Sequence, residues 1–372
     1  MTSQTAVREA VRVTVSPPVG WNWRRPVRVV LTGAPALWLL FVVAQLVVSG
    51  RLWWWRPADL LPPFLFVAVP VLLTLVALPF RCSRRNAAVL CAGALAIGVS
   101  LAGFNPLGAL RGGGPVPPDG VRVVSWNTGY WHEPGEEGDF YALLARQEAD
   151  VYLLQEYLYY PDGVPVRVDE LETLRQRMPD YHVAVAGELI TLSRYPIVAQ
   201  YGLDAPGAPV PPDSDFPDFW RYKTLRTDLR VGDRVLSVYN AHIPTPLWIG
   251  GPSPFSAQFW NTIRDLHGQR GPQLAALARD VEANPNPVFV AGDMNTTSAM
   301  GERERFPAGL RDAAEAGGAF YPASWPVGGD NFPLWWRLDW ALVSPGVQVH
   351  RYQLRDPAGL SDHRLQYTAV SP

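Results

Sequence analysis

The sequence predicts an α/β domain that follows three transmembrane helices, and three observations support this fold class. The first is a charge asymmetry: residues 1–106 hold ten arginines and two acidic residues, whereas the remainder holds 22 basic and 32 acidic residues. The second is that the long uncharged apolar stretches all lie in the first part. The third is that residues 121–372 alternate short β-favouring runs with amphipathic, helix-forming segments.

The uncharged apolar stretches cover residues 29–49, 60–80 and 86–104, which are 21, 21 and 19 residues long. About 20 apolar residues span a bilayer as a helix, so we expect three spans at about these positions. The tryptophans at 53–55 lie between the first two stretches, where an aromatic belt at the membrane surface is expected. Buried helices of a soluble protein are the alternative. A cleaved signal peptide fits poorly, because the first stretch is long and two more follow it.

Arginines flank these stretches unevenly, and this predicts an orientation. Three precede the first stretch and three lie between the second and third, whereas the loop between the first and second has two. The positive-inside rule therefore places the N-terminal tail, residues 1–28, in the cytoplasm and the part after residue 106 outside it. If the third stretch does not insert, that part lies in the cytoplasm instead. The six arginines on the cytoplasmic side are Arg24, Arg25, Arg28, Arg81, Arg84 and Arg85.

The second part begins after a stretch rich in Gly and Pro, residues 105–120, which is expected to be a linker. Apolar periodicity predicts its elements in order. The expected strands are 121–127, 150–156, 181–186, 189–193, 224–229, 235–241, one from 288, 338–343 and 365–370, and the expected helices are 139–149, 169–178 and 272–283. Both cysteines, Cys82 and Cys91, precede the linker, so this domain needs no disulfide.

Polar side chains stand at the ends of several expected strands. Asp293 and Asn295 follow the strand from 288 and would project to the same side of an extended chain. Alone, this Gly-Asp-x-Asn stretch could equally be a turn. The arrangement recurs at Asn127, Glu156, His242 and the pair Asp362 and His363. Converging strand ends would bring carboxylates, carboxamides and imidazoles together in one cleft.

Such a cleft suits metal-assisted phosphoester hydrolysis. Carboxylates hold Mg²⁺ or Mn²⁺ and leave sites for phosphate oxygens and water. A carboxylate can also hold the attacking water, and an imidazole can stabilise phosphoryl charge. No serine elbow, cysteine nucleophile, glycine-rich phosphate loop or dense Cys/His zinc cluster competes with this interpretation. The apolar stretches hold no acid, Lys or His, which disfavours a transporter.

Six short motifs in the second part occur in an order that is typical of one enzyme family. They are Ser125-Trp126-Asn127, Leu154-Gln155-Glu156, the stretch 192–197 (LSRYPI), Asn240-Ala241-His242, Gly292-Asp293-Met294-Asn295 and Ser361-Asp362-His363. Over about residues 121–371 the chain resembles the endonuclease/exonuclease/phosphatase superfamily. This superfamily includes pancreatic-type deoxyribonucleases, abasic-site endonucleases, inositol polyphosphate 5-phosphatases and neutral sphingomyelinases. The resemblance implies a four-layered αββα sandwich, in which helices flank two packed mixed sheets.

The resemblance also implies a role for each carboxylate and carboxamide. Glu156 would be the principal ligand of a Mg²⁺ or Mn²⁺ cofactor, with Asn127 and Asp362 nearby. Asp293 would orient or deprotonate the attacking water, and Asn295 would hold phosphate. Asn127 could instead be a turn residue.

The histidines receive roles from the same resemblance. His363 would face the phosphate and would be oriented by Asp339, and His242 would be a second phosphate contact. Two alternatives stay open: Asp339 as a strand-end cap and His242 as a structural hydrogen bonder. The sequence does not place the superfamily's catalytic tyrosine, and Tyr222 is not assigned to this role.

The charge of the second part bears on the substrate. Proteins that bind long nucleic acids are usually basic, whereas this part is acidic and the whole chain has a single lysine, Lys223. We therefore expect a small or membrane-borne phosphodiester, a lipid or small molecule in preference to long nucleic acid. The aromatic-rich stretches 216–222 and 247–260 could border the cleft or touch lipid. An extracytoplasmic nuclease on DNA or RNA is one alternative, and a non-catalytic, membrane-anchored binding module is another. No protein partner is predicted.

Overall fold

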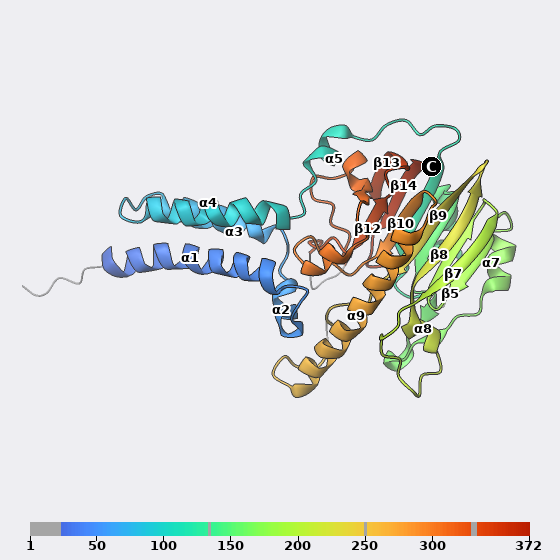
Figure 1. The fold of residues 1–372 in the computed structure, drawn as a ribbon, viewed down its shortest axis with the longest axis horizontal. Helices are drawn as coiled ribbons and strands as arrows, with labels where there is room; N and C mark the ends of the chain where they lie inside the picture. Colours follow the sequence, from blue (N-terminus) through green and yellow to red (C-terminus); the bar gives the residue numbers. More distant parts are fainter. Residues whose placement is uncertain (1–23, 133–134, 249–250, 329–332) are drawn as a thin grey trace, which may run out of the picture.

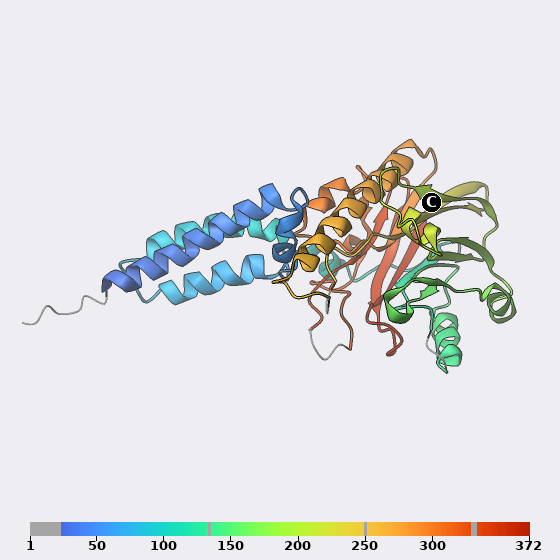
Figure 2. The same cartoon turned by 90° about the horizontal axis from the view of Figure 1, so that it is seen from below.

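The computed structural model describes residues 24–132, 135–248, 251–328 and 333–372. Among these residues, two six-stranded sheets pack face to face, and a bundle of helices projects from one end of the resulting sandwich (Figures 1 and 2). The predicted α/β sandwich is therefore confirmed. The projecting bundle consists of the apolar part of the chain.

The first sheet has the strand order β13-β14-β1-β2-β6-β5. Its central strands β1 (Val121–Asn127) and β2 (Val151–Gln155) are parallel, and all other neighbours are antiparallel. Because β1 and β2 run in the same direction, their carboxyl ends lie side by side. The remaining strands are β5 (His182–Ala186), β6 (Leu189–Ser193), β13 (Gln348–Arg355) and β14 (Leu365–Ser371).

The second sheet has the order β11-β12-β10-β9-β8-β7, again with one parallel pair, β9 (Arg234–His242) and β10 (Val288–Asp293). The remaining strands are β7 (Ile197–Asp204), β8 (Tyr222–Val231), β11 (Arg311–Asp312) and β12 (Asp339–Val343), and a separate small sheet pairs β3 (Leu158–Tyr159) with β4 (Val166–Arg167). Strands β7 and β13 have no counterpart among the expected strands. Both are edge strands with register shifts, which interrupt the alternation that marks a strand.

The described helices cover the outer faces of the sandwich. Helices α6 (Glu137–Gln147) and α7 (Leu171–Arg177) pack on the first sheet, and α9 (Ala257–Ala283) packs on the second. A third cluster of buried apolar side chains fills the space between the sheets. The shorter helices are η1 (Trp53–Trp55), α2 (Arg56–Asp59), α5 (Pro106–Arg111), η2 (Pro161–Gly163), α8 (Pro217–Arg221), η3 (Gly301–Arg305) and η4 (Ala313–Ala316).

Helix α9 is much longer than the segment 272–283 that the sequence predicts. Pro272 lies inside it rather than at its start. The helix continues through this residue because its earlier turns also bury apolar side chains, among them Phe259, Ile263 and Leu266. Tertiary burial here outweighs the helix-breaking tendency of proline.

The projecting bundle contains α1 (Arg24–Val48), α3 (Leu65–Ala77) and α4 (Arg84–Leu101). Two of these, α1 and α4, are long and apolar enough to cross a membrane, by length and composition. Only two of the three expected spans therefore qualify by this measure, because α3 has only 13 residues and is about 20 Å long at 1.5 Å per residue. Pro62 and Pro63 precede α3 and Pro79 follows it, which explains why it is shorter than the uncharged stretch.

Polar contacts fix the base of the bundle to the sandwich. Ser298 Oγ donates to the carbonyl of Leu101 (2.7 Å), and Gln45 Nε2 donates to the carbonyl of Ala299 (2.9 Å). A Cβ atom on Gly301 would lie 2.1 Å from the carbonyl oxygen of Ser49, so only glycine permits this approach of the two backbones. Residues 298–301 follow closely after β10, and the bundle therefore lies near the end of that strand.

Candidate active site

The ends of neighbouring strands bring the predicted polar residues together. The register of the second sheet pairs Asp293 with His242 on one side and with Asp339 on the other. In the first sheet Asn127 lies opposite Gln155, and Glu156 is the next residue. The side-chain amide of Asn127 donates to Glu156 Oε1 (3.0 Å) and to Asp293 Oδ2 (3.2 Å). One carboxamide thus connects the two sheets at the site.

Three residues at these strand ends have unusual backbone conformations. Glu156 and Asn295 have positive φ angles of 63° and 44°, which residues other than glycine rarely adopt. These left-handed residues turn the chain where β2 and β10 end. At Gly292 a Cβ atom would lie 1.9 Å from the carbonyl oxygen of Ala241. Glycine is therefore required immediately before Asp293, and strained backbone of this kind is typical of functional sites.

Asp293 lies at the centre of the site, surrounded by nitrogen atoms. Its Oδ2 atom accepts hydrogen bonds from Asn127 and from Asn295 Nδ2 (3.0 Å), and it lies 3.6 Å from His242 Nε2 and 3.7 Å from His363 Nε2. Burial raises the pKa of Asp293; the charge of His363 opposes this shift and that of Asp339 adds to it. A carboxylate with a raised pKa is a better general base near neutral pH.

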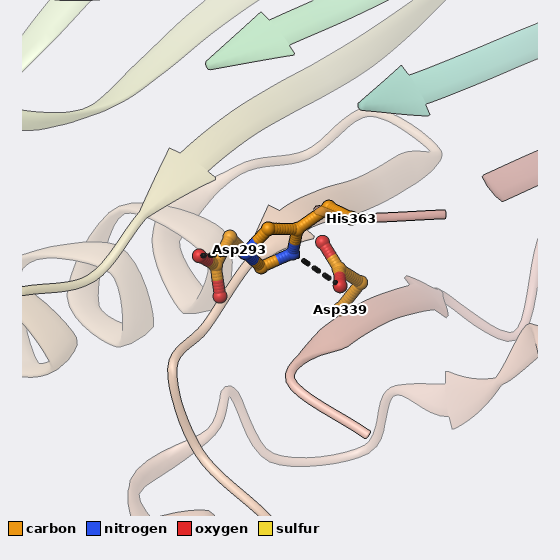
Figure 3. A group of neighbouring side chains, drawn as sticks. All are labelled: Asp293, Asp339 and His363. Atoms are coloured by element: carbon orange, nitrogen blue, oxygen red, sulfur yellow. Dashed lines mark hydrogen bonds and ion pairs between the residues drawn. The ribbon is translucent and has the colours of Figure 1, made fainter. Parts of the chain in front are cut away.

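His363 is held between two carboxylates (Figure 3). Its Nδ1 atom lies 2.9 Å from Asp339 Oδ2, and its Nε2 atom faces Asp293. Burial alone would lower the pKa of His363, but the charges of Asp339 and Asp293 outweigh it and raise the pKa to about 10. The imidazole is therefore protonated at neutral pH, and it can donate a hydrogen bond to a phosphoryl oxygen.

His242 has a similar carboxylate partner, Glu188, which is not among the residues predicted from the sequence. His242 Nδ1 lies 3.2 Å from Glu188 Oε2, and Lys223 pairs with the other oxygen of the same carboxylate. Burial would raise the pKa of Glu188, but the charges of His242 and Lys223 outweigh it and lower the pKa to about 2. The only signal in the sequence is an acid after Gly187 and directly before a buried strand, and this resembles an ordinary turn.

Replacing Glu188 by glutamine is expected to lower kcat by about 10- to 100-fold, because it removes the charge that orients His242 and keeps it protonated. We would measure kcat, KM and their pH dependence for the full chain. A matched control is Glu170→Gln, which changes a second Glu–His pair, with His132, outside this site. Equal effects of the two substitutions on kcat and on its pH profile would contradict a positioning role for Glu188.

The other predicted metal ligand, Asp362, has a different hydrogen-bond partner from Glu156. Its side chain is exposed, and its Oδ2 atom accepts a hydrogen bond from Trp325 Nε1 (2.7 Å). Glu156 instead accepts hydrogen bonds from Asn127 and from the backbone N–H of Tyr130 (2.8 Å). The structure therefore joins Glu156 and Asn127 directly and leaves Asp362 at the rim.

The donor set of the site fits a hard divalent cation. Asp293, Asp339 and His363 each offer one ligand atom within 4.8 Å of the others. Both ring nitrogens of His363 already face a carboxylate, Nδ1 facing Asp339 and Nε2 facing Asp293, so His363 is poorly suited as a ligand. The oxygens of Glu156, at the more open end of the site, are better suited, since Mg²⁺ and Mn²⁺ prefer oxygen ligands.

Two tyrosines lie close to Glu156. The rings of Tyr130 and Tyr160 stack with centroids 5.8 Å apart, and the Tyr130 backbone contacts the Glu156 carboxylate. Burial raises the pKa of both phenols. Tyr222, in contrast, lines a separate cavity of about 500 Å³ that none of the predicted site residues lines.

Comparison with known proteins places the chain among phosphoester hydrolases. Residues 124–363 match the Endonuclease/Exonuclease/phosphatase family. No curated protein sequence matches the chain. Members of this superfamily are hydrolases that act on phosphoesters, generally with a divalent metal.

Several solved structures are similar in shape, at low sequence identity. A family protein from Bacteroides thetaiotaomicron is 15% identical, with a TM-score of 0.47, and the match covers 68% of this chain and 97% of that one. A mannosyl-6-phosphatase from the same organism is 13% identical (TM-score 0.46; 68% and 100% covered). A 3′ phosphatase from Neisseria bound to a product DNA hairpin is 17% identical (TM-score 0.49; 67% and 98% covered).

Proposed function

This chain belongs to the endonuclease/exonuclease/phosphatase family, and we propose that it is a membrane-anchored, divalent-metal-dependent phosphodiesterase. The observation that supports this proposal most is the environment of Asp293. Two imidazoles face its carboxylate, and each is backed by a second carboxylate, Asp339 for His363 and Glu188 for His242. A non-catalytic binding module would not need two such pairs around one buried acid.

In the proposed reaction Asp293 orients a water molecule and accepts its proton. Its raised pKa suits it to this role, because a general base works best when its pKa is near the operating pH. His363, protonated and held by Asp339, donates a hydrogen bond to the phosphoryl oxygens and stabilises the charge that develops there. His242 and Asn295 contact Asp293 on its other sides and are proposed to hold the phosphate.

Glu156 is proposed as the principal residue that holds Mg²⁺ or Mn²⁺, with Asn127 and Asp362 nearby. A bound divalent cation would neutralise phosphate charge and lower the pKa of water. Burial raises the pKa of Glu156, so protons compete with a cation for this carboxylate, and metal affinity should weaken as the pH falls.

The bundle is proposed to be the membrane anchor. Only 17% of the most apolar 18-residue stretch of α1 is buried, and 28% of that of α4, whereas a core helix of a soluble protein is mostly buried. The end of the bundle that lies away from the sandwich holds the start of α1 and the turn between α3 and α4, with exposed arginines (Arg25, Arg28, Arg81, Arg84 and Arg85). By the positive-inside rule this end is cytoplasmic and the catalytic domain lies on the opposite side of the membrane.

The acidic character of the domain favours a small or membrane-borne phosphodiester over long nucleic acid. The test uses the full chain in phospholipid nanodiscs, with and without Mg²⁺ or Mn²⁺. Substrates are plasmid DNA, a single-stranded oligonucleotide, sphingomyelin and phosphatidylinositol in vesicles, and bis-p-nitrophenyl phosphate. Hydrolysis of the lipids or of the small ester without DNA cleavage supports the proposal. Faster cleavage of DNA or of the oligonucleotide would favour the nuclease alternative.

Glu156→Gln is expected to lower metal-dependent turnover by about 10³-fold, because a catalytic cation supplies several kcal/mol of charge stabilisation and each 1.36 kcal/mol is tenfold in rate. The variant should also bind Mn²⁺ more weakly in calorimetry. Glu170→Gln serves as the control, since Glu170 pairs with His132 away from the site. Unchanged Mn²⁺ affinity in Glu156→Gln would overturn the assignment of this ligand.

A further inference from the structure

Large aromatic side chains are exposed around the base of the bundle. They come from four separate segments of the chain, and one of them, Phe255, is fully exposed to solvent (100%). A single exposed apolar residue is ordinary, but a group of aromatic residues around one feature marks an interaction surface. The exposed members of this group, which we name the aromatic collar, are Trp54, Phe255, Phe320 and Trp335.

On one side of the bundle, contacts hold the start of α9 against η1. The rings of Trp53 and Trp260 pack edge to face with centroids 6.2 Å apart, and the guanidinium of Arg264 lies 4.7 Å from the Trp53 ring. Figure 1 shows α9 slanting from the sandwich toward the bundle, so that its first turns lie at about the same position along the bundle axis as α2. Phe255 precedes this helix by two residues and therefore lies near the same position along the bundle axis.

On another side, a second set of contacts holds collar residues against the other two helices of the bundle. The Phe320 ring stacks on Phe104, just after α4, with centroids 4.9 Å apart. The Trp335 ring packs on Phe64, just before α3, at 5.4 Å. Collar residues therefore lie on two sides of the base of the bundle, beside the helix ends that are nearest to the sandwich.

We propose that the aromatic collar seats the catalytic domain on the surface of the bilayer that the bundle enters. Aromatic rings prefer the interface between headgroups and acyl chains, where an apolar body and a polar edge are both satisfied. Trp54 lies in η1, shortly after α1, and the rings of Phe320 and Trp335 contact residues next to α4 and α3, so the collar lies beside the helices that are proposed to enter the bilayer. The proposal rests on the membrane insertion of the bundle proposed above.

This seating also places the candidate active site next to the membrane. The chain from Asp293 reaches the bundle within five residues, where Ser298 contacts Leu101. A second connection runs through tryptophans: the Trp325 ring lies 6.4 Å from that of His363 and 5.7 Å from that of Trp336. Trp336 Nε1 in turn donates to the carbonyl of Leu60, between α2 and α3 (2.9 Å). A phosphodiester in the headgroup layer would lie close to these residues.

Spin labels on the full chain can test the seating directly. The native cysteines are replaced (Cys82→Ser, Cys91→Ala), and single labels are introduced by Phe255→Cys or Phe320→Cys. The protein is studied in phosphatidylcholine/phosphatidylglycerol nanodiscs, and accessibility to oxygen is compared with accessibility to a water-soluble nickel chelate. Leu40→Cys, on the exposed surface of α1, reports bundle insertion, and Val198→Cys, on the edge strand β7, reports an exposed apolar site away from the bundle.

The expected result is that labels at 40, 255 and 320 are accessible to oxygen and protected from nickel, whereas the label at 198 is not protected. If the label at residue 40 is protected from nickel and the labels at residues 255 and 320 are as accessible to nickel as the label at residue 198, the collar proposal is overturned while the membrane anchor stands. If the label at residue 40 is accessible to nickel, both proposals fail. Dipolar broadening between labels at 255 or 320 would show that a second copy of the chain covers the collar, which also overturns the bilayer assignment.

Discussion

Asp293→Asn is expected to reduce turnover by about 10³- to 10⁴-fold while leaving the fold and metal binding intact. An asparagine has nearly the same shape and can keep the contact with the Asn295 backbone N–H, which donates to Asp293 Oδ1 at 2.8 Å. It cannot accept a proton from water, and it loses the charge that both imidazoles face. The measurement is kcat/KM of the full chain in nanodiscs, together with Mn²⁺ calorimetry.

Asp280→Asn is a suitable control for this variant, because Asp280 is a partly buried acid on α9 that pairs with Arg226 and Tyr239 far along the helix from the site. In the wild type, kcat/KM should fall as the pH drops through the raised pKa of Asp293, since the protonated acid is no base. On the alkaline side the profile should stay flat until the pH approaches the pKa of His363, about 10. Turnover within tenfold of wild type in Asp293→Asn would rule out a general-base role.

The sequence is sufficient to predict the polar strand ends, because each stands directly after or before a short apolar run. Parallel pairing then explains their convergence: β1 lies beside β2 and β9 beside β10, so carboxyl ends meet. Asn127, Glu156, His242, Asp293 and Asn295 are brought together in this way. Asp339 and His363 join them because the antiparallel strands β12 and β14 begin where their neighbours β10 and β1 end.

Other features depend on tertiary contacts that no local pattern contains. Glu188 reaches His242 only because β6 of one sheet lies behind β9 of the other. Asp362 belongs to the same motif as His363, yet its side chain turns outward to Trp325. The length of α3 is set by the prolines on either side of it, which lie inside the uncharged apolar stretch and do not interrupt it. Helix α9 continues through Pro272 because its earlier turns are buried.

Arg56→Met is expected to destabilise the chain by about 3–5 kcal/mol, because it removes one member of a buried, balanced set of four charges. Arg56 lies 3.3 Å from Asp59 and pairs with Glu302 of the sandwich. Arg270 Nε lies 3.5 Å from Glu302, and the side chains of all four residues are almost fully buried. Without Arg56, two carboxylates and one guanidinium would remain out of contact with water.

The loss should also reach the active site. Arg270 Nη2 donates to Thr296 Oγ1 (2.8 Å), and its Nη1 atom bonds the carbonyl of Pro244. These partners follow Asn295 and His242 by one and two residues, so Arg270 supports both loops that leave the site. If its pairing with Glu302 is disturbed, kcat should fall together with stability. In this view the base of the bundle would support the candidate active site as well as the proposed membrane anchor.

Thermal unfolding of the full chain in nanodiscs provides the measurement, and a shift of roughly 10 °C is expected if 1 kcal/mol corresponds to about 2–4 °C for a domain of this size. Arg51→Met, at an exposed position in the turn after α1, is the control and should shift the midpoint by little. The double variant Arg56→Met/Glu302→Leu removes one charge of each sign and should recover much of the loss, because the remaining Asp59 and Arg270 balance each other. A double variant less stable than Arg56→Met would show instead that Glu302 supports the site loops through contacts other than this charge set.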